Sequence, residues 1–208
     1  MLCPCPDGEG VYRAVDTHIQ RGWSADQARH IAGLYDEAFG AKFERAIPDK
    51  AKRLVLLARS FEPDFSFVAL QGDRIVGLAG IQESAGSLTG GLDASKLIDT
   101  LGLIRGLWAC CIFTLFERQP EPGELVMDGI AVDRSVRGQG IGSALLDRII
   151  GYAADNGFRS VRLDVIDSNP RARKLYESKG FVATRSERFP YLAWLIGFSG
   201  ATTMVLEV

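Results

Sequence analysis

The sequence predicts an α/β fold in which helices flank one central mixed sheet. The chain has 208 residues, of which 47% are apolar and 24% charged, as in an ordinary globular protein. A turn signal at residues 71–74 separates two apolar runs and indicates an antiparallel hairpin. From residue 125 onward, strand and helix patterns alternate. At roughly 100–200 residues per domain, we expect a single domain over residues 1–208.

The first half of the chain contains two helix patterns and the hairpin. Ser24 and Gln27 have the spacing of a capping box, and Gly40 follows the last apolar residue that repeats at helical spacing. We expect, in order, an irregular tail at about residues 1–10, a short strand at 11–15, helices at 24–40 and 49–59, and strands at 65–70 and 75–81.

A helical insertion is expected at about residues 84–123, between the hairpin and the second half of the chain. It begins with a Gly- and Ser-rich loop, continues as a helix at about 94–117, and ends in a cluster of Pro and Gly. The uninterrupted apolar part of this helix, residues 107–116, is too short to cross a bilayer, which takes about 20 residues.

The second half of the chain carries the most regular patterns. Apolar residues cover half of the circumference of a helix at 140–156, and apolar and polar residues alternate at 160–166. Asn169 followed by Pro170 is typical of a helix start, and Gly180 of a helix end. We expect helices at 140–156 and from Pro170 to Gly180, and strands at 125–132, 160–166, 181–187 and 202–208.

Charge and cysteine content exclude several classes of function. The chain has 24 Lys and Arg against 26 Asp and Glu, so it lacks the basic footprint of a protein that binds duplex nucleic acid. Cys3, Cys5, Cys110 and Cys111 form no CxxC pair, and we expect no metal site. The N-terminus lacks the apolar segment of a secretory signal. We therefore expect a cytoplasmic protein without a membrane span.

A glycine-rich turn between a strand and a helix is the most informative motif. Gly138, Gly140 and Gly142 alternate at the start of the helix. Glycine lets the main chain approach a ligand closely, and the unpaired N–H groups at a helix start lie at the positive end of the helix dipole. With Arg137 beside them, these residues predict a cradle for a phosphate or pyrophosphate.

Three kinds of glycine loop compete for this motif. A P-loop requires a Lys before its Ser or Thr, whereas Ser143 follows Gly142 directly. A dinucleotide-binding turn has the spacing GxGxxG, whereas this turn reads GxGxG and lies late in the chain. A third pattern, Arg/Gln-x-x-Gly-x-Gly/Ala, is met by Arg137, Gly140 and Gly142.

The segments IAVDRSVRGQGIGSALL (130–146) and NPRARKLYESKGF (169–181) resemble the GNAT superfamily of acetyl-CoA-dependent N-acetyltransferases. The resemblance is strong over about residues 124–181. It implies a mostly antiparallel sheet in which two parallel neighbours, at 125–132 and 160–166, splay apart around the coenzyme. It also implies a set of coenzyme-binding residues, which comprises Ile130, Ala131 and Val132 along the pantetheine arm, Arg137, Gly138, Gln139, Gly140, Ile141, Gly142 and Ser143 around the pyrophosphate, and Asn169 near the thiol.

The same resemblance implies that Tyr176 is the general acid that protonates the coenzyme thiolate. Asp128 is our candidate for the general base. It lies four residues before Val132, so the two side chains share a face of the sheet if the strand is regular, and a bulge would reverse that assignment. Glu83, Glu124 and a chain of water molecules are the alternatives.

The resemblance therefore predicts an N-acetyltransferase. We expect a primary amine of a small molecule or a protein to attack acetyl-CoA directly, with no metal. A non-catalytic sensor that binds acyl-CoA is the alternative, and an enzyme dependent on ATP or NAD is a third possibility. We expect the apolar segments 97–116 and 190–198 to contact each other, either as a wall of the acceptor site or in a homodimer.

Overall fold

The computed structural model describes residues 17–44, 46–104, 106–107, 119–189 and 198–208. Within this part of the chain the strands form a mixed sheet in the order β1-β2-β3-β5-β6-β8-β7, with β4 paired to β3. Among these strands, β5 and β6 form a parallel pair and the other neighbours are antiparallel, which confirms the predicted fold class. The strands are β1 (Thr17–Arg21), β2 (Ser66–Gln71), β3 (Arg74–Glu83), β4 (Gly86–Ser87), β5 (Glu124–Val132), β6 (Ser160–Ile166), β7 (Val182–Arg188) and β8 (Gly200–Glu207).

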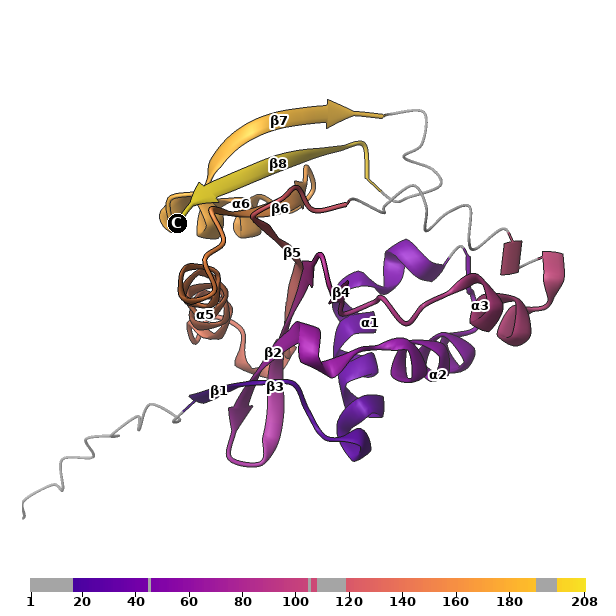
Figure 1. Ribbon diagram of the computed structural model, residues 1–208. Helices are drawn as coiled ribbons and strands as arrows, with labels where there is room; N and C mark the ends of the chain where they lie inside the picture. Colours follow the sequence, from indigo (N-terminus) through magenta and orange to yellow (C-terminus); the bar gives the residue numbers. More distant parts are fainter. Residues whose placement is uncertain (1–16, 45, 105, 108–118, 190–197) are drawn as a thin grey trace, which may run out of the picture.

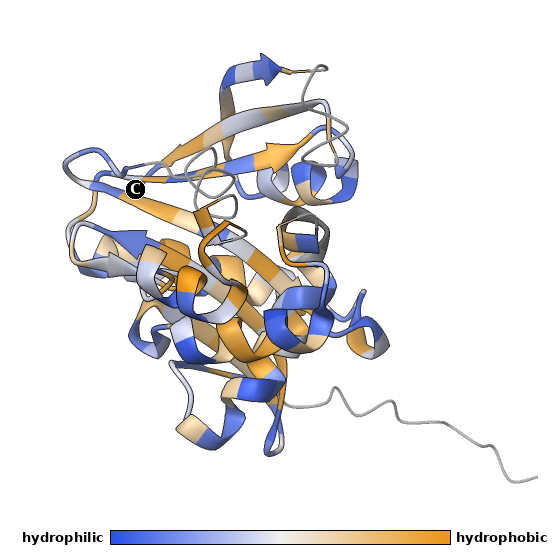
Figure 2. Ribbon diagram, turned by 90° about the vertical axis from the view of Figure 1, so that its right-hand side faces the viewer, coloured by the Kyte–Doolittle hydropathy of each residue, from blue (hydrophilic) through white to orange (hydrophobic). Residues whose placement is uncertain are grey.

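Helices cover both faces of the sheet (Figure 1). One face carries α5 (Ile141–Asp155) and α6 (Pro170–Ser178), and the other carries α1 (Ala28–Glu44) and α2 (Lys50–Ser60). We call these the α5 face and the α1 face. A shorter helix, α3 (Ala94–Leu101), lies beside α2. In Figure 2 the hydrophobic colour lies mainly on the central strands, and the outer turns are mostly hydrophilic.

Each face has its own hydrophobic core. On the α5 face, Leu145 and Ile149 are fully buried against Leu125 and Leu163 of the two parallel strands. On the α1 face, Ile31 is buried with Val68, Leu78 and other residues of β2 and β3. Burial of apolar side chains on both faces holds the central strands in a fixed position. The candidate site lies along two of them, β5 and β6.

Helix α5 approaches β3 closely because Gly77 has no side chain. A Cβ atom at residue 77 would lie 3.0 Å from both Ile141 Cγ2 and Leu145 Cδ1. This close contact brings the first turn of α5 next to the end of β5, so the glycine-rich turn that precedes α5 lies at the edge of the sheet.

Helix α1 is longer than predicted and passes through Gly40 to end at Glu44. Gly40 does not end the helix; the absence of its side chain makes room for a contact within the helix. A Cβ atom there would lie 2.7 Å from Asp36 Oδ1, which also accepts a 2.5 Å hydrogen bond from Arg53 Nε of α2. Glycine at residue 40 therefore leaves room for a buried ion pair that joins α1 to α2.

Other differences from the predicted elements lie in the first half of the chain. The expected helix at 94–117 is interrupted, because α3 ends at Leu101 and Gly102 adopts a φ of 80°. Strand β1 was not predicted and pairs with β2. The predicted tail at 1–10, the strand at 11–15, and residues 108–118 and 190–197 lie outside the described residues, so the predicted contact between 97–116 and 190–198 stays untested. Within the described part of the chain, no helix is both long and apolar enough to cross a membrane.

Candidate active site

The glycine-rich turn leads directly into the N-terminus of α5. Gly138 and Gly140 have φ values of 89° and 82°, which side chains other than glycine rarely tolerate. A Cβ atom at either position would meet no atom of the described residues within 4 Å, so the turn faces open space. The main chain is therefore accessible from outside at this point, as the sequence predicts for an anion cradle.

Most amide groups of this turn are available as donors. Ala144 N bonds to Gly140 O at 3.0 Å and begins the regular hydrogen bonding of the helix. The amides of Arg137 and Gln139 make long turn contacts of 3.5 and 3.4 Å. The remaining amides of the turn have no backbone acceptor within the described residues: Gly138, Gly140, Ile141, Gly142 and Ser143. These donors lie at the positive end of the helix dipole, an arrangement that suits a phosphate group.

Two contacts anchor this turn to the sheet. Arg137 Nε donates a 2.9 Å hydrogen bond to Val132 O at the end of β5. Asp133 forms an ion pair with Arg74 at the start of β3. Hydrogen bonds from the amide and hydroxyl of Ser135, with a smaller contribution from Arg74, lower the pKa of Asp133. The cradle is thus held in place before any ligand arrives.

The parallel strands separate beside the cradle. Pairing between β5 and β6 extends from Glu124 with Ser160 to Met127 with Leu163, and the ladder stops there. Beyond that point β6 pairs with β8, and residues 129–132 of β5 pair with β3. The edge of residues 128–132 that faces β6 has no ladder partner within the described residues. We call this opening between β5 and β6 the splay.

A bulge in β5 lies at the start of the splay. Gly80 pairs with Gly129 and Ile81 with Met127, so Asp128 is the additional residue. A Cβ atom at Gly80 would contact both Asp128 Cβ and Leu88, which places Asp128 on the α1 face. Val132 packs in the core of the α5 face. Of the two arrangements that the sequence left open, the strand thus adopts the bulged one, and Asp128 and Val132 lie on opposite faces because the bulge shifts the alternation by one residue.

Two aromatic residues of α1 lie against this bulge, and the sequence analysis did not identify them. A Cβ atom at Gly129, where φ is 154°, would lie 2.5 Å from Phe39 Cζ. The ring of Tyr35 lies 4.7 Å from that of Phe39. Burial, and then the negative charge of Asp128, raise the pKa of Tyr35. The i, i+4 spacing of Tyr35 and Phe39 indicates one helix face, but it does not indicate which strand that face contacts.

Tyr176 lies on the opposite face of the sheet from Asp128. It is 7% exposed within the core of the α5 face, and its ring lies 6.1 Å from that of Phe181. Burial raises the pKa of Tyr176 to about 12. The hydroxyl, which bonds to no other described residue, is therefore protonated across the neutral range and can act as a proton donor.

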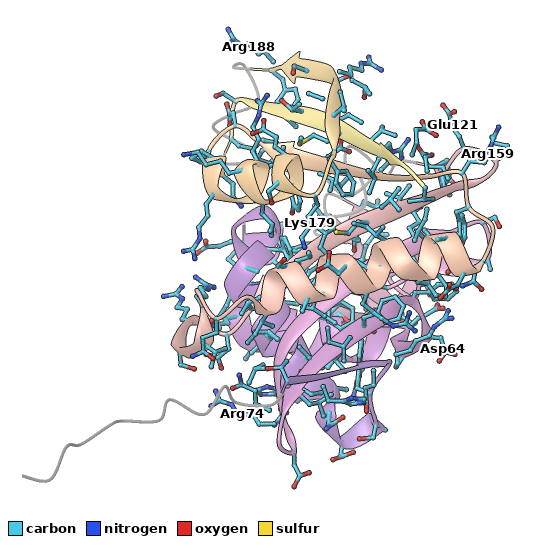
Figure 3. The ribbon with its side chains drawn as sticks, turned by 90° about the vertical axis from the view of Figure 1, so that its left-hand side faces the viewer. Asp64, Arg74, Glu121, Arg159, Lys179 and Arg188 are labelled. Atoms are coloured by element: carbon cyan, nitrogen blue, oxygen red, sulfur yellow. The ribbon has the colours of Figure 1, made fainter. Side chains whose placement is uncertain are left out.

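Asn169 caps the helix that carries Tyr176. Its Oδ1 accepts a 3.1 Å hydrogen bond from Ala172 N. At the other end of α6, Lys179 Nζ lies 2.7 Å from Asp147 of α5, and Figure 3 shows Lys179 beside α5. The first contact caps α6 and the second holds α6 against α5, and together they limit the movement of the helix that carries Tyr176.

The two alternative bases, Glu83 and Glu124, lie at the end of the parallel pair where β5 and β6 are still hydrogen-bonded. We call this the closed end. Glu124 forms a 3.0 Å ion pair with Arg162 at the start of β5. Glu83 accepts a 2.8 Å hydrogen bond from Tyr152 and lies near Arg21. Neither carboxylate is at the splay, whereas Asp128 is. No group of three or more metal-binding side chains is found among the described residues.

Comparisons with known proteins agree with this geometry. A family model described as "Acetyltransferase (GNAT) family" matches residues 30–181. Thialysine N-epsilon-acetyltransferase of Bos taurus is 39% identical over 56 residues, which are 27% of this chain and 33% of that protein. N-acetyltransferase 8B of Homo sapiens is 37% identical over 67 residues, which are 32% of this chain and 30% of that protein. The matches thus span about a third of each curated relative.

Solved structures share the whole fold. A GCN5-related N-acetyltransferase from Kribbella flavida has a TM-score of 0.61 and 17% identity, and the match covers 92% of this chain and 98% of that one. Ard1 from Thermoplasma volcanium has a TM-score of 0.57 and 20% identity over 92% of this chain and 97% of that one. At these identities the similarity establishes the fold.

Proposed function

The chain belongs to the GNAT acetyltransferase family, and we propose that it transfers an acetyl group from acetyl-CoA to a primary amine. The observation that carries this proposal is the coincidence of the cradle at Gly138–Ser143 with the splay beside residues 128–132. The first offers donors for a diphosphate, and the second offers an unpaired strand edge for an extended amide-containing arm. Coenzyme A has both groups, in that order.

We assign the residues of the cradle and the strand edge to the coenzyme. The amides of residues 137–143 would hold the diphosphate, and Ile130, Ala131 and Val132 would pair with the pantetheine arm as an added strand does. Asn169 lies at the start of the helix that carries Tyr176 and would be near the thiol. A thioester that passes through the splay would then have access to both faces of the sheet.

The acceptor amine would approach from the α1 face. Asp128 takes a proton from the ammonium, directly or through a water molecule, and the neutral nitrogen attacks the carbonyl carbon. The carbon–sulfur bond breaks, and Tyr176 donates its proton to the departing sulfur from the α5 face. The new amide nitrogen loses its remaining extra proton to water, and a proton from water restores the Tyr176 phenol. The positions of the two residues thus separate proton removal from proton delivery by the thickness of the sheet.

The relative thialysine N-epsilon-acetyltransferase is named for a side-chain amine, which is consistent with an aliphatic amine acceptor. We keep the cytoplasmic location and the homodimer as predictions. The family match leaves an enzyme that depends on ATP or NAD without support. A sensor that binds acyl-CoA without transfer remains the competing function, because it would use the same cradle.

Two measurements test the proposed function. Saturation with acetyl-CoA at about 100 times Kd should add roughly 2.7 kcal/mol to the free energy of unfolding. For a chain of this size, that raises Tm by several degrees, and ATP or NAD should not. Release of free thiol that depends on an added amine would identify an enzyme. A rise in Tm without thiol release for any amine would favour the sensor, and no rise in Tm would exclude both.

A further inference from the structure

A buried ion pair joins α1 to α2 on the α1 face of the sheet. Arg53 Nε donates a 2.5 Å hydrogen bond to Asp36 Oδ1, and Arg53 Nη2 donates a 3.2 Å bond to Asp36 Oδ2. The third nitrogen, Nη1, donates a 2.7 Å bond to Ile47 O in the connection between the two helices. The guanidinium of Arg53 therefore binds the middle of α1 and the segment before α2 at the same time.

The same stretch of α1 reaches the start of the splay. Phe39 lies three residues after Asp36, and a Cβ atom at Gly129 would meet three atoms at the tip of the Phe39 ring, at 2.5, 3.0 and 3.3 Å. The ring thus occupies the place that a side chain at residue 129 would take. Phe39 is partly exposed, and Asp128, next to Gly129, is exposed. In the proposed mechanism the acceptor amine reaches Asp128 from this side, so the ring forms a wall of its path.

Apolar packing alone leaves the exact position of α1 along β5 weakly determined. Contacts between apolar side chains are non-directional, whereas paired hydrogen bonds from a guanidinium to a carboxylate have a fixed geometry. Replacement of both partners of a buried ion pair by apolar residues is often neutral for stability, although loss of one partner is not. The best-attested benefit of such a pair is the register that it fixes between packed helices.

Helix α2 provides the frame to which this pair attaches α1. The residue after α2, Phe61, is buried at 8% exposure. Glu62 N then bonds to Leu88 O at 2.9 Å, and Leu88 N bonds to Ile81 O of β3 at 3.2 Å. The end of α2 is therefore tied to the sheet, and Arg53 connects α1 to this frame.

Gly40 leaves the carboxylate of Asp36 in the position that Arg53 requires. A Cβ atom at residue 40 would lie 2.7 Å from Asp36 Oδ1 and 3.0 Å from Asp36 Cγ. A side chain at this position would push the carboxylate away from the guanidinium. Substitution of Gly40 therefore disturbs the pair without removal of either charge.

We propose that Asp36 and Arg53 are positioning residues for the acceptor site: their ion pair holds Phe39 against Gly129 and so sets the path of the amine. This inference rests on the proposed function, because the acceptor is that of the proposed reaction. Neither charged group contacts the reacting atoms, and both act through the Phe39 ring. Loss of the pair lets α1 shift, so the amine meets the thioester in a poorer geometry, while the cradle at the start of α5 is unaffected.

The position of Phe39 can be measured by NMR without an acceptor. The Hα shifts of Gly129 depend on the aromatic ring beside them, and Phe39→Leu gives their values without that ring. The double variant Asp36→Leu/Arg53→Met replaces both charges by apolar side chains and should stay folded. We expect its Gly129 shifts to move toward the Phe39→Leu values while the amide shift of Leu163 in β6 stays constant. Unchanged Gly129 shifts in this variant would overturn the inference.

Two single variants test the same point if the double variant does not fold. Gly40→Ala displaces the carboxylate with both charges intact. Arg53→Lys keeps the charge but lacks the planar fork that binds both Asp36 oxygens and Ile47 O. Both variants should move the Gly129 shifts in the same direction as the double variant. Wild-type shifts in both would overturn the inference.

Leu56→Ala is the matched control for a general loosening of α2. Leu56 lies three residues after Arg53, is 2% exposed and packs in a small core with Ile47 and Leu97, so its loss weakens α2 but leaves the ion pair intact. We expect wild-type Gly129 shifts in this variant. Shifts as large as those of Gly40→Ala would show that any disturbance of α2 has this effect, and they would overturn the role of the pair.

Kinetics with 1-aminobutane show whether the position of Phe39 matters for transfer. Measured by thiol release, kcat/KM for this amine should fall by roughly tenfold to a hundredfold in Gly40→Ala, while KM for acetyl-CoA and the rise in Tm with acetyl-CoA stay as in the wild type. Moved Gly129 shifts with an unchanged kcat/KM would overturn the role in the acceptor site. Absence of any response of the wild type to acetyl-CoA would instead refute the proposed function, and the NMR result would still decide whether the pair positions Phe39.

Discussion

Asp128, at the opening between β5 and β6, and Tyr176, in the core beneath α5 and α6, lie on opposite faces of the sheet. Asp128 faces α1 because the bulge adds a residue to β5, and Tyr176 is buried in the core beneath α5 and α6. A regular strand would place Asp128 in the apolar core of the α5 face or shift every residue after it. In the proposed mechanism, the bulge therefore decides which side of the sheet receives the acceptor.

Replacement of Gly129 should show how tightly the bulge is packed. Gly129→Ala places a Cβ atom 2.5 Å from Phe39 and forces alanine into a φ of 154°. We expect a loss of about 2–4 kcal/mol in the free energy of unfolding, measured with denaturant. Gly151→Ala is the matched control, since this helical position has open space within the described residues and should gain up to about 1 kcal/mol. A loss below 1 kcal/mol for Gly129→Ala would show that Phe39 moves away easily.

Tyr176→Phe should separate the catalytic role from packing. If Tyr176 is the acid, kcat falls by roughly 10²–10⁴ while the rise in Tm with acetyl-CoA is kept. The wild-type pKa of about 12 means that ionisation of Tyr176 does not limit activity below that pH. An unchanged kcat would remove Tyr176 from the mechanism.

The same variant should change the dependence of stability on pH. Because burial raises the pKa of Tyr176 from 10.0 to about 12, its contribution is complete below pH 10 and is lost as the pH rises through 12. Between pH 9 and pH 11.5 the wild type should therefore lose about 2 kcal/mol more than Tyr176→Phe does. Denaturant titrations at pH 9 and pH 11.5 measure the difference. Parallel curves for the two proteins would contradict the raised pKa.

Asp128→Asn should impair the removal of a proton without loss of the coenzyme. We expect kcat/KM for amines to fall by about 10²–10⁴ at neutral pH and to recover in part at high pH, where more of the amine is already neutral. Glu83→Gln is the control, because Glu83 lies at the closed end and bonds to Tyr152. If Glu83→Gln lowers the rate and Asp128→Asn does not, the assignment of the base is reversed.

The ion pair between Asp36 and Arg53 should be essential for stability. Both side chains are nearly buried, at 4% and 7% exposure, and Arg53 also donates to Ile47 O. Arg53→Met leaves a buried carboxylate without this partner and should cost about 3–5 kcal/mol. Lys179→Met, which breaks a more exposed pair with Asp147, should cost less than about 1 kcal/mol. Similar losses for the two variants in denaturant would show that Arg53 contributes little.

Local sequence patterns predicted much of this fold. Alternation in β6 and the apolar half of α5 are determined by neighbouring residues, and both elements match closely. Gly40 was misread because its requirement comes from Asp36 and Arg53, a contact between two helices. The face of Asp128 stayed open in the sequence because a bulge depends on the pairing of β5 with β3. Tyr35 reaches the site through tertiary packing, which its spacing along the helix does not reveal.

In the proposed function, the amides of residues 137–143 hold the diphosphate of acetyl-CoA. Amide NMR of the labelled protein, titrated with coenzyme A and separately with pantetheine, measures this contact, since pantetheine lacks the diphosphate. We predict large shifts of the Gly138, Gly140 and Gly142 amides with coenzyme A and small ones with pantetheine. Amides that stay unmoved at saturating coenzyme A would contradict the claim.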